Sequence, residues 1–152
     1  MRNIKNIFVH CTASQQTATV QQILREFKQR GWRTPGYHYI IDPKGILTQL
    51  VAEDRISNGV KGYNAESINV AYIGGIDANN KPIDNRTPEQ KKTLLSILTR
   101  LKQKYPNAII MGHRDISPDK NHNGIVDPWE RIKECPCFNA KTEYANIKEI
   151  LI

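Results

Sequence analysis

The sequence predicts a single α/β domain in which a central mixed β-sheet is flanked by helices. Short apolar stretches typical of strands alternate with amphipathic stretches typical of helices, and one strand is apolar almost throughout. The length of 152 residues suits one domain. We find no internal repeat and no linker in the sequence, so we treat residues 1–152 as one unit.

Five stretches are predicted to form the sheet. Residues 4–10 alternate in part between apolar and polar, and 37–41 and 46–51 are separated by a turn, which predicts a hairpin. The stretch 68–73 is mostly apolar, which indicates a strand buried on both faces, and 108–111 is a short apolar strand.

Two helices are marked by their first residues. The pattern Thr-x-x-Gln begins at Thr19 and again at Thr87, and it predicts a capping box at each helix start. The first helix should end at Gly31 and the second near Tyr105. The tail 143–152 carries apolar residues at helical spacing and is predicted to form a helix that covers the core.

Charge and cysteine content restrict the partners and the compartment. The net charge of +7 suits an anionic partner such as nucleic acid, lipid headgroups or a cell-wall polymer, but the Lys and Arg residues are dispersed. An odd number of cysteines speaks against a disulfide framework and favours a metal-binding or catalytic role. We expect no membrane span and no signal peptide, hence synthesis in the cytoplasm and release or export by another route.

Candidate metal ligands are far apart in the sequence. His10 and His113 each lie where a predicted strand leads into a loop, and Cys135 follows in a segment rich in polar residues. Two imidazoles and one thiolate suit Zn²⁺ and leave a fourth position for water. A lone His is more often a hydrogen-bonded structural residue, so spacing alone favours the structural explanation. The positions at strand ends are what indicate a zinc site.

Eight short motifs occur in order between about residues 7 and 140: Val9–Thr12, Gly31–Trp32, Gly36–Ile41, Lys61–Ile68, Gly74–Asp77, Thr87–Gln90, Gly112–Arg114 and Lys133–Phe138. Together they resemble the zinc N-acetylmuramoyl-L-alanine amidases of the phage lysozyme and peptidoglycan recognition protein family. The resemblance implies that His10, His113 and Cys135 bind zinc and that Tyr37 and Lys133 are catalytic.

The resemblance also implies a reaction. The family cleaves the amide between muramic acid and L-alanine in peptidoglycan. Zinc lowers the pKa of bound water to about 7 and polarises the carbonyl. Lys133 would then stabilise the oxyanion, and Tyr37 would hold the water or the oxyanion and is, with a water, a candidate proton shuttle. Without the resemblance, the simpler interpretation of Tyr37 would be an aromatic residue of the core, and that of Lys133 a solvent-exposed lysine.

Three functional alternatives follow. The first is a phage or prophage-type lysin that acts on the cell wall as a monomer. The second is a non-catalytic peptidoglycan-binding module, although such relatives usually lack the Cys ligand, and Cys135 is present. The third is a nucleic-acid or polymerase partner, which dispersed charge without a basic aromatic face disfavours. We therefore expect no nucleic-acid partner.

The sequence departs from the family pattern in several places. Many relatives carry a His where this chain has Ser57–Val60, which puts any contact of that His in doubt. Cys137 replaces a small or hydroxyl residue, and three roles are open: an inert buried thiol, a competitor of Cys135 for zinc, or its disulfide partner. Cys11 should point to the opposite face from His10, toward the core.

An insertion between the second and third zinc ligands has the pattern of an EF-hand calcium loop at 119–130. The residues at ligand positions, which would bind a structural Ca²⁺, are Asp119, Asn121, Asn123, Ile125, Asp127 and Glu130. Against calcium, a Pro precedes the loop, a second Pro lies within it, and no second copy exists to pair with it.

Overall fold

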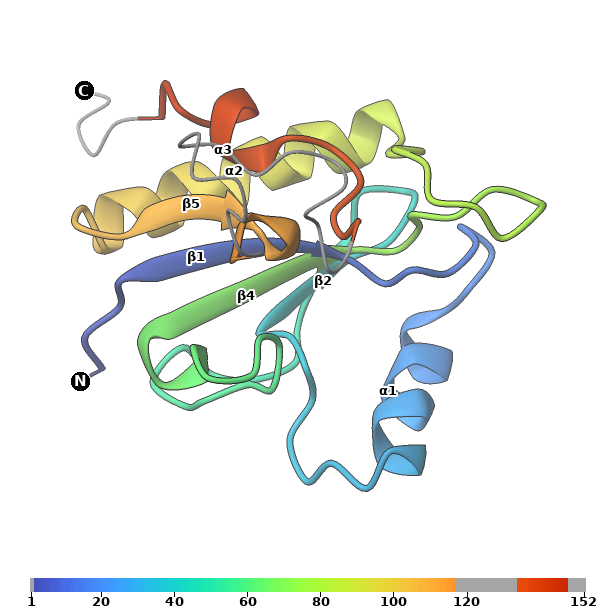
Figure 1. Cartoon of the computed structure of the whole chain (residues 1–152), viewed down its shortest axis with the longest axis horizontal. Helices are drawn as coiled ribbons and strands as arrows, with labels where there is room; N and C mark the ends of the chain where they lie inside the picture. Colours follow the sequence, from blue (N-terminus) through green and yellow to red (C-terminus); the bar gives the residue numbers. More distant parts are fainter. Residues whose placement is uncertain (1, 117–133, 148–152) are drawn as a thin grey trace, which may run out of the picture.

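A computed structural model describes residues 2–116 and 134–147 of the chain (Figure 1). Its sheet has five strands in the order β3-β2-β4-β1-β5. In sequence these are β1 (Asn6–Cys11), β2 (Tyr39–Ile41), β3 (Leu47–Gln49), β4 (Ser67–Tyr72) and β5 (Ile109–Gly112).

The sheet is mixed, as the sequence predicts. Strand β1 pairs in parallel with β4 and β5, and β2 pairs in parallel with β4. The predicted hairpin is present, because β3 runs antiparallel to β2. Every residue of β4 is buried, which confirms that this strand is covered on both faces.

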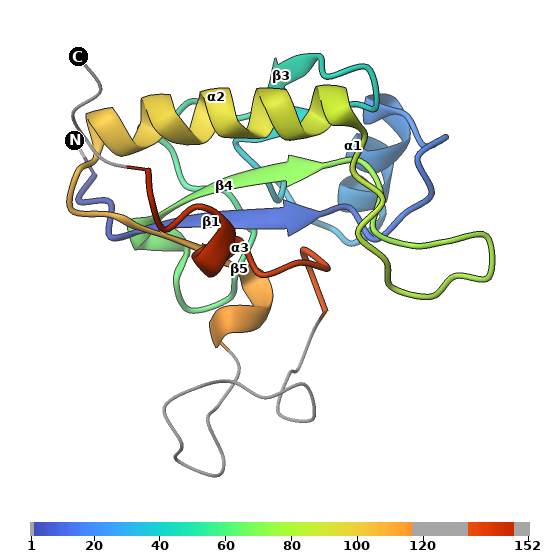
Figure 2. The ribbon, with the colours of Figure 1, turned by 90° about the horizontal axis from the view of Figure 1, so that it is seen from above.

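Helices cover both faces of the sheet (Figures 1 and 2). Helix α2 (Pro88–Lys104) packs on the face toward which β1 directs Ile7, Val9 and Cys11. Helix α1 (Val20–Gln29) lies on the other face, where Ile23 and Phe27 form a second apolar cluster with Ile40 and Ile73. Cys11 therefore points to the core, as predicted, and His10 to the opposite face.

The N-terminal caps of both helices are as predicted. Thr19 accepts from the Gln22 N–H while the Gln22 side chain accepts from the Thr19 N–H, and Thr87 and Gln90 repeat this arrangement. Each capping box satisfies two helix-end donors that would otherwise lack partners. These starts are set by residues three positions apart, which is why the sequence identifies them.

The C-terminal segment differs from its prediction. The described helix is α3 (Ala140–Glu143), which ends where the predicted helix at 143–152 was to begin, and residues 148–152 lie outside the described part. Tyr144 and Ile147 still pack on the core, as expected of a covering segment. Asn139 caps α3 by accepting from the Thr142 N–H, and this cap starts the helix earlier than the apolar spacing indicated.

Two short 3-10 helices complete the described elements, η1 (Asn64–Glu66) and η2 (His113–Ile116). Within the described residues, no helix combines the length and apolar character needed to cross a bilayer.

Candidate metal centre and its pocket

Three potential metal ligands from distant parts of the chain meet at one end of the sheet. The ligand atoms of His10, His113 and Cys135 all lie within 4.8 Å of one another. His10 belongs to β1, His113 is the first residue after β5, and Cys135 lies in the segment that leads to α3. The three residues predicted as zinc ligands are therefore brought together.

The register of the parallel strands explains why the two imidazoles are neighbours. Val9 in β1 lies opposite Gly112 in β5. Because the strands run in the same direction, the next residue on each, His10 and His113, emerges at the same end of the sheet. The two rings have centroids 5.1 Å apart and planes inclined at 75°.

Backbone contacts hold Cys135 against the ends of these strands. The Cys11 N–H donates to Cys135 Sγ at 3.2 Å, and the Arg114 N–H donates to the Cys135 carbonyl at 2.8 Å. The following Pro136 packs directly on Gly112, where an added Cβ would lie 2.5 Å from its Cδ atom. Glycine is required at this position because any side chain would push the Cys135 segment away from His113.

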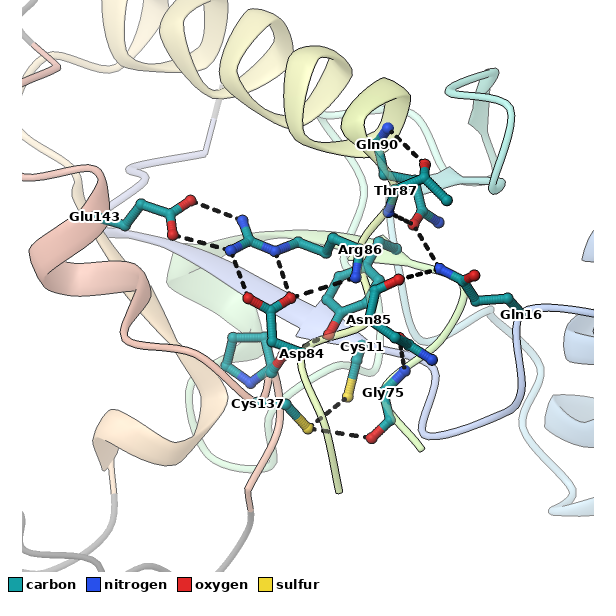
Figure 3. Close-up of polar contacts among 12 residues, drawn as sticks. Cys11, Gln16, Gly75, Asp84, Asn85, Arg86, Thr87, Gln90, Cys137 and Glu143 are labelled. Atoms are coloured by element: carbon teal, nitrogen blue, oxygen red, sulfur yellow. Dashed lines mark hydrogen bonds and ion pairs between the residues drawn. The ribbon is translucent and has the colours of Figure 1, made fainter. Parts of the chain in front are cut away.

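A buried arginine anchors the segment that follows Cys135 (Figure 3). Arg86 bonds Asp84 at 2.8 Å and Glu143 of α3 at 2.7 Å, and its guanidinium lies 3.4 Å from the ring centroid of Phe138. Its side chain is only 2% exposed. Arg86, in the loop before α2, therefore contacts the segment 138–143 at both of its ends.

Cys137 is directed away from the three ligand atoms. Its Sγ lies 3.9 Å from Cys11 Sγ and donates to the Gly75 carbonyl at 3.3 Å (Figure 3). The neighbouring Cys135 sulfur and burial raise the pKa of Cys11 to about 12, so this thiol stays protonated at neutral pH. Of the three roles open for Cys137, the contacts favour a thiol packed on Cys11, and it is half-buried.

The donor set suits zinc chemically. It comprises two imidazole nitrogens and a cysteine sulfur, which matches the ligand preference of Zn²⁺ and leaves one coordination position open. His10 is 1% exposed, and its Nε2 lies 2.7 Å from Asn69 Oδ1. Metal-binding imidazoles typically use their second nitrogen in such a contact.

A pocket adjoins the three ligands, and Tyr37 lies in its wall. The lining includes Phe27, Arg30, Trp32, Tyr37, Asn58 and His113. The Tyr37 ring lies 5.2 Å from that of His10, and its hydroxyl donates to the Cys11 carbonyl at 3.4 Å. Burial raises the pKa of Tyr37 well above its usual value, so the phenol is neutral and remains a hydrogen-bond donor.

The remaining predicted site residues lie outside the described residues. These are Lys133 and the six positions of the calcium pattern, Asp119, Asn121, Asn123, Ile125, Asp127 and Glu130. The structure also reveals three polar residues that the sequence reading missed: His38, Ser57 and Asn69, all fully buried behind His10. One signal was available, because Asn69 is the single amide in the apolar strand β4.

Sequence relatives of the chain include phage endolysins. The Amidase_2 family, described as N-acetylmuramoyl-L-alanine amidase, matches residues 1–130, a range that includes His10, Tyr37 and His113 and ends before Cys135. The endolysin of Klebsiella phage KP32 is 38% identical over 137 residues, covering 89% of this chain and 82% of the relative. The endolysin of Escherichia phage T7 is 36% identical with the same coverage.

Solved structures give the same result for the fold. The N-acetylmuramoyl-L-alanine amidase LysC from Clostridium intestinale matches with a TM-score of 0.71 and 27% identity, over 93% of this chain and 82% of its own. The Drosophila peptidoglycan recognition protein SA, at 13% identity and a TM-score of 0.70, shares the fold over 100% of this chain and 83% of its own. With the family match and the phage relatives, these findings show that the chain belongs to the Amidase_2 family of N-acetylmuramoyl-L-alanine amidases.

Proposed function

We propose that the chain is a zinc-dependent peptidoglycan amidase of the phage-lysin type, which cleaves the bond between N-acetylmuramic acid and the L-alanine of the stem peptide. The observation that carries the proposal is the convergence of His10, His113 and Cys135 within 4.8 Å, beside a pocket. A purely structural role would not require the imidazole of His10 to meet a second imidazole and a thiol, both more than 100 positions away in the sequence, at a pocket wall.

His10, His113 and Cys135 would hold the zinc ion. When bound, zinc supplies Lewis acidity toward water and toward the carbonyl of the scissile amide. The three protein ligands leave room for substrate chemistry because they occupy only part of a tetrahedral shell.

Tyr37 and Lys133 are assigned the role of stabilising the negative charge that develops on the carbonyl oxygen during the reaction. The neutral Tyr37 hydroxyl faces the same pocket as the ligands and is able to donate a hydrogen bond to an oxyanion. Lys133, two residues before Cys135 in the sequence, would bring a positive charge to the same oxygen. Proton transfer to the leaving amine is assigned to Tyr37 or to a water molecule.

A non-catalytic peptidoglycan-binding module is the alternative. Binding modules of this family usually lack the Cys ligand, and the presence of Cys135 beside the two imidazoles favours the enzyme. The phage endolysins among the relatives also favour it. The cell wall is accordingly the expected place of action.

Digestion of purified peptidoglycan tests the proposal. Zinc-loaded protein should release stem peptides with a free L-alanine amino group, detected by mass analysis, and stripped protein should not. Cys135→Ala should abolish release and zinc binding while the protein stays folded. Cys137→Ser is the matched control, because it removes a nearby thiol that faces Cys11 instead of the ligands, and it should retain activity. Release of peptides by Cys135→Ala at the native rate would refute the assignment.

Calcium binding at 119–130 stays a proposal that rests on the sequence pattern alone. The ion would hold the insertion in the conformation that places Lys133 and Cys135 next to His113. Adding calcium to protein that was first stripped of metal with a chelator and then reloaded with zinc should raise the melting temperature, and Asp119→Ala should remove the effect. An unchanged melting temperature at calcium concentrations on the order of millimolar, the weak end of the range for such loops, would argue against an ion site.

A further inference from the structure

A row of buried polar side chains lies behind His10. It consists of His38, Ser57 and Asn69, each 0% exposed, and it ends at His10, which is 1% exposed. Burial of so many polar groups is costly unless each donor meets an acceptor. The direction of every hydrogen bond in the row is therefore constrained by its neighbours.

The direction of one hydrogen bond in the row is certain, because its donor is a backbone N–H. The backbone N–H of Asn69 donates to His38 Nδ1 at 3.1 Å, so that nitrogen carries a lone pair. The proton of the neutral ring is then on Nε2, which donates to the Arg55 carbonyl at 2.7 Å. Arg2 Nη2 lies 3.1 Å from the same Nε2, and this is a contact between two donors. Burial lowers the pKa of His38 to about 4, so the ring is neutral at pH 7.

The hydroxyl of Ser57 links His38 to Asn69 and determines which end of the Asn69 amide it contacts. Ser57 Oγ lies 3.0 Å from the same Nδ1, which carries no proton, so the Ser57 oxygen does not accept there and the hydroxyl shares this acceptor with the Asn69 N–H. Its oxygen then accepts from Asn69 Nδ2 at 2.8 Å. With the amide nitrogen engaged in this way, Asn69 Oδ1 is the atom that faces His10.

His10 is thereby held in one tautomer. Asn69 Oδ1 only accepts hydrogen bonds, so His10 Nε2, 2.7 Å away, must carry the ring proton. The lone pair of the neutral ring is consequently on Nδ1. That nitrogen is the one that faces Cys135 Sγ, at 3.7 Å.

The loop that carries Ser57 also closes over the amide. A Cβ added at Gly59 would lie 2.4 Å from Cγ and Oδ1 of Asn69, so only glycine permits this approach. The stretch Ser57–Val60 is where the chain departs from the family pattern, and here its residues pack on the amide that contacts His10. Packing and hydrogen bonds together prevent the Asn69 side chain from rotating.

We propose that Asn69 is a positioning residue, which acts with Ser57 and His38 to hold the proton of His10 on Nε2 and so present Nδ1 to the metal. The inference rests on the proposed zinc site. An outer-shell contact of this kind fixes the orientation and tautomer of a metal-binding imidazole, and its loss typically weakens metal binding by about 10–100-fold.

The test begins with the native protein without metal. Long-range ¹H–¹⁵N NMR correlations of the His10 ring should show the Nε2–H tautomer as the dominant form. Asn69→Leu keeps a similar volume but removes the acceptor. It should give a mixture of tautomers and weaken zinc binding, measured by chelator competition, by about 10–100-fold.

Gln90→Leu is the matched control. Gln90 is also a fully buried amide, but its side chain bonds the carbonyls of Ile41 and Ile73 and the backbone of Thr87 at the start of α2. This variant should also lose stability, because the carbonyls of Ile41 and Ile73 lose their donor and the capping box of α2 is broken. It should leave the His10 tautomer and the zinc dissociation constant unchanged, which separates positioning from general destabilisation.

Several results would overturn the role of Asn69. One is a dominant Nδ1–H tautomer in the native chain, and another is zinc binding by Asn69→Leu within about threefold of native. If Asn69→Leu does not fold, Ser57→Ala is the second variant. It removes the acceptor that fixes which end of the Asn69 amide faces His10, so it should still give mixed tautomers, and a single tautomer there would count against the ordered row. A native chain with the Nε2–H tautomer that binds no zinc would instead refute the zinc site itself.

Discussion

Protonation of His38 is expected to destabilise the fold as the pH falls from 6.5 towards 4. The ring is fully buried, and burial lowers its pKa from 6.5 to about 4. The unfolded chain therefore binds a proton between these pH values while the folded chain does not. The stability that this group contributes is fully present above pH 6.5 and is lost as the pH falls toward the folded pKa.

The size of the effect follows from the two pKa values. The difference between 6.5 and about 4, at about 1.36 kcal/mol per pKa unit, corresponds to about 3 kcal/mol. Most of this should be lost by pH 4.5. Hydrogen bonds from Arg86 lower the pKa of Glu143, so this carboxylate contributes to acid unfolding at lower pH than the His38 window.

Urea unfolding of metal-free protein at a series of pH values measures the effect, because zinc release at low pH then makes no contribution. His38→Gln is the comparison variant, since its amide is able to accept from the Asn69 N–H and to donate to the Arg55 carbonyl without titrating. Its free energy of unfolding should fall less between pH 6.5 and 4.5. Equal pH dependence in both proteins would refute the reasoning, and an NMR titration of His38 gives its pKa directly.

Three further outcomes are expected. Tyr37→Phe should lower turnover by about 100-fold, as loss of an oxyanion donor does, with zinc affinity unchanged; a native rate would remove the hydroxyl from the mechanism. Lys133→Ala should likewise lower turnover by about 100-fold while zinc content, measured by mass spectrometry, stays near native; parallel losses of both would indicate a structural role. Arg86→Met should lower the free energy of unfolding by about 3 kcal/mol, because Asp84 and Glu143 lose a buried partner. The exposed cation Lys104 is the control, and Lys104→Met should cost at most about 1 kcal/mol; equal costs would contradict the role given to burial.

Much of the fold could be predicted because its signals are local. The capping boxes at Thr19 and Thr87 depend on residues three positions apart, and the buried strand β4 is visible as a run of apolar side chains. The tail was predicted to be helical at 143–152; its described part, 144–147, is not helical, and the helix α3 lies just before it at Ala140–Glu143. The prediction followed the apolar spacing of the tail and gave no weight to Asn139, whose side chain caps the helix.

The candidate site was predictable in its residue types but not in its surroundings. His10, His113 and Cys135 were identified from ordered motifs, and the parallel register of β1 and β5 then brings the two imidazoles together. The partners of Cys137 were not predictable, since its contacts with Cys11 and Gly75 join residues more than 60 positions apart.

The sequence by itself determined the elements, the fold class and the family, because capping, apolar periodicity and motif order are properties of neighbouring residues. Only the tertiary structure decided which atom of His10 faces Cys135. That choice depends on hydrogen bonds from Asn69 to residues 59 and 12 positions away, through Ser57. A hydrogen bond has a direction only when both partners are placed, and the chain places these partners by folding.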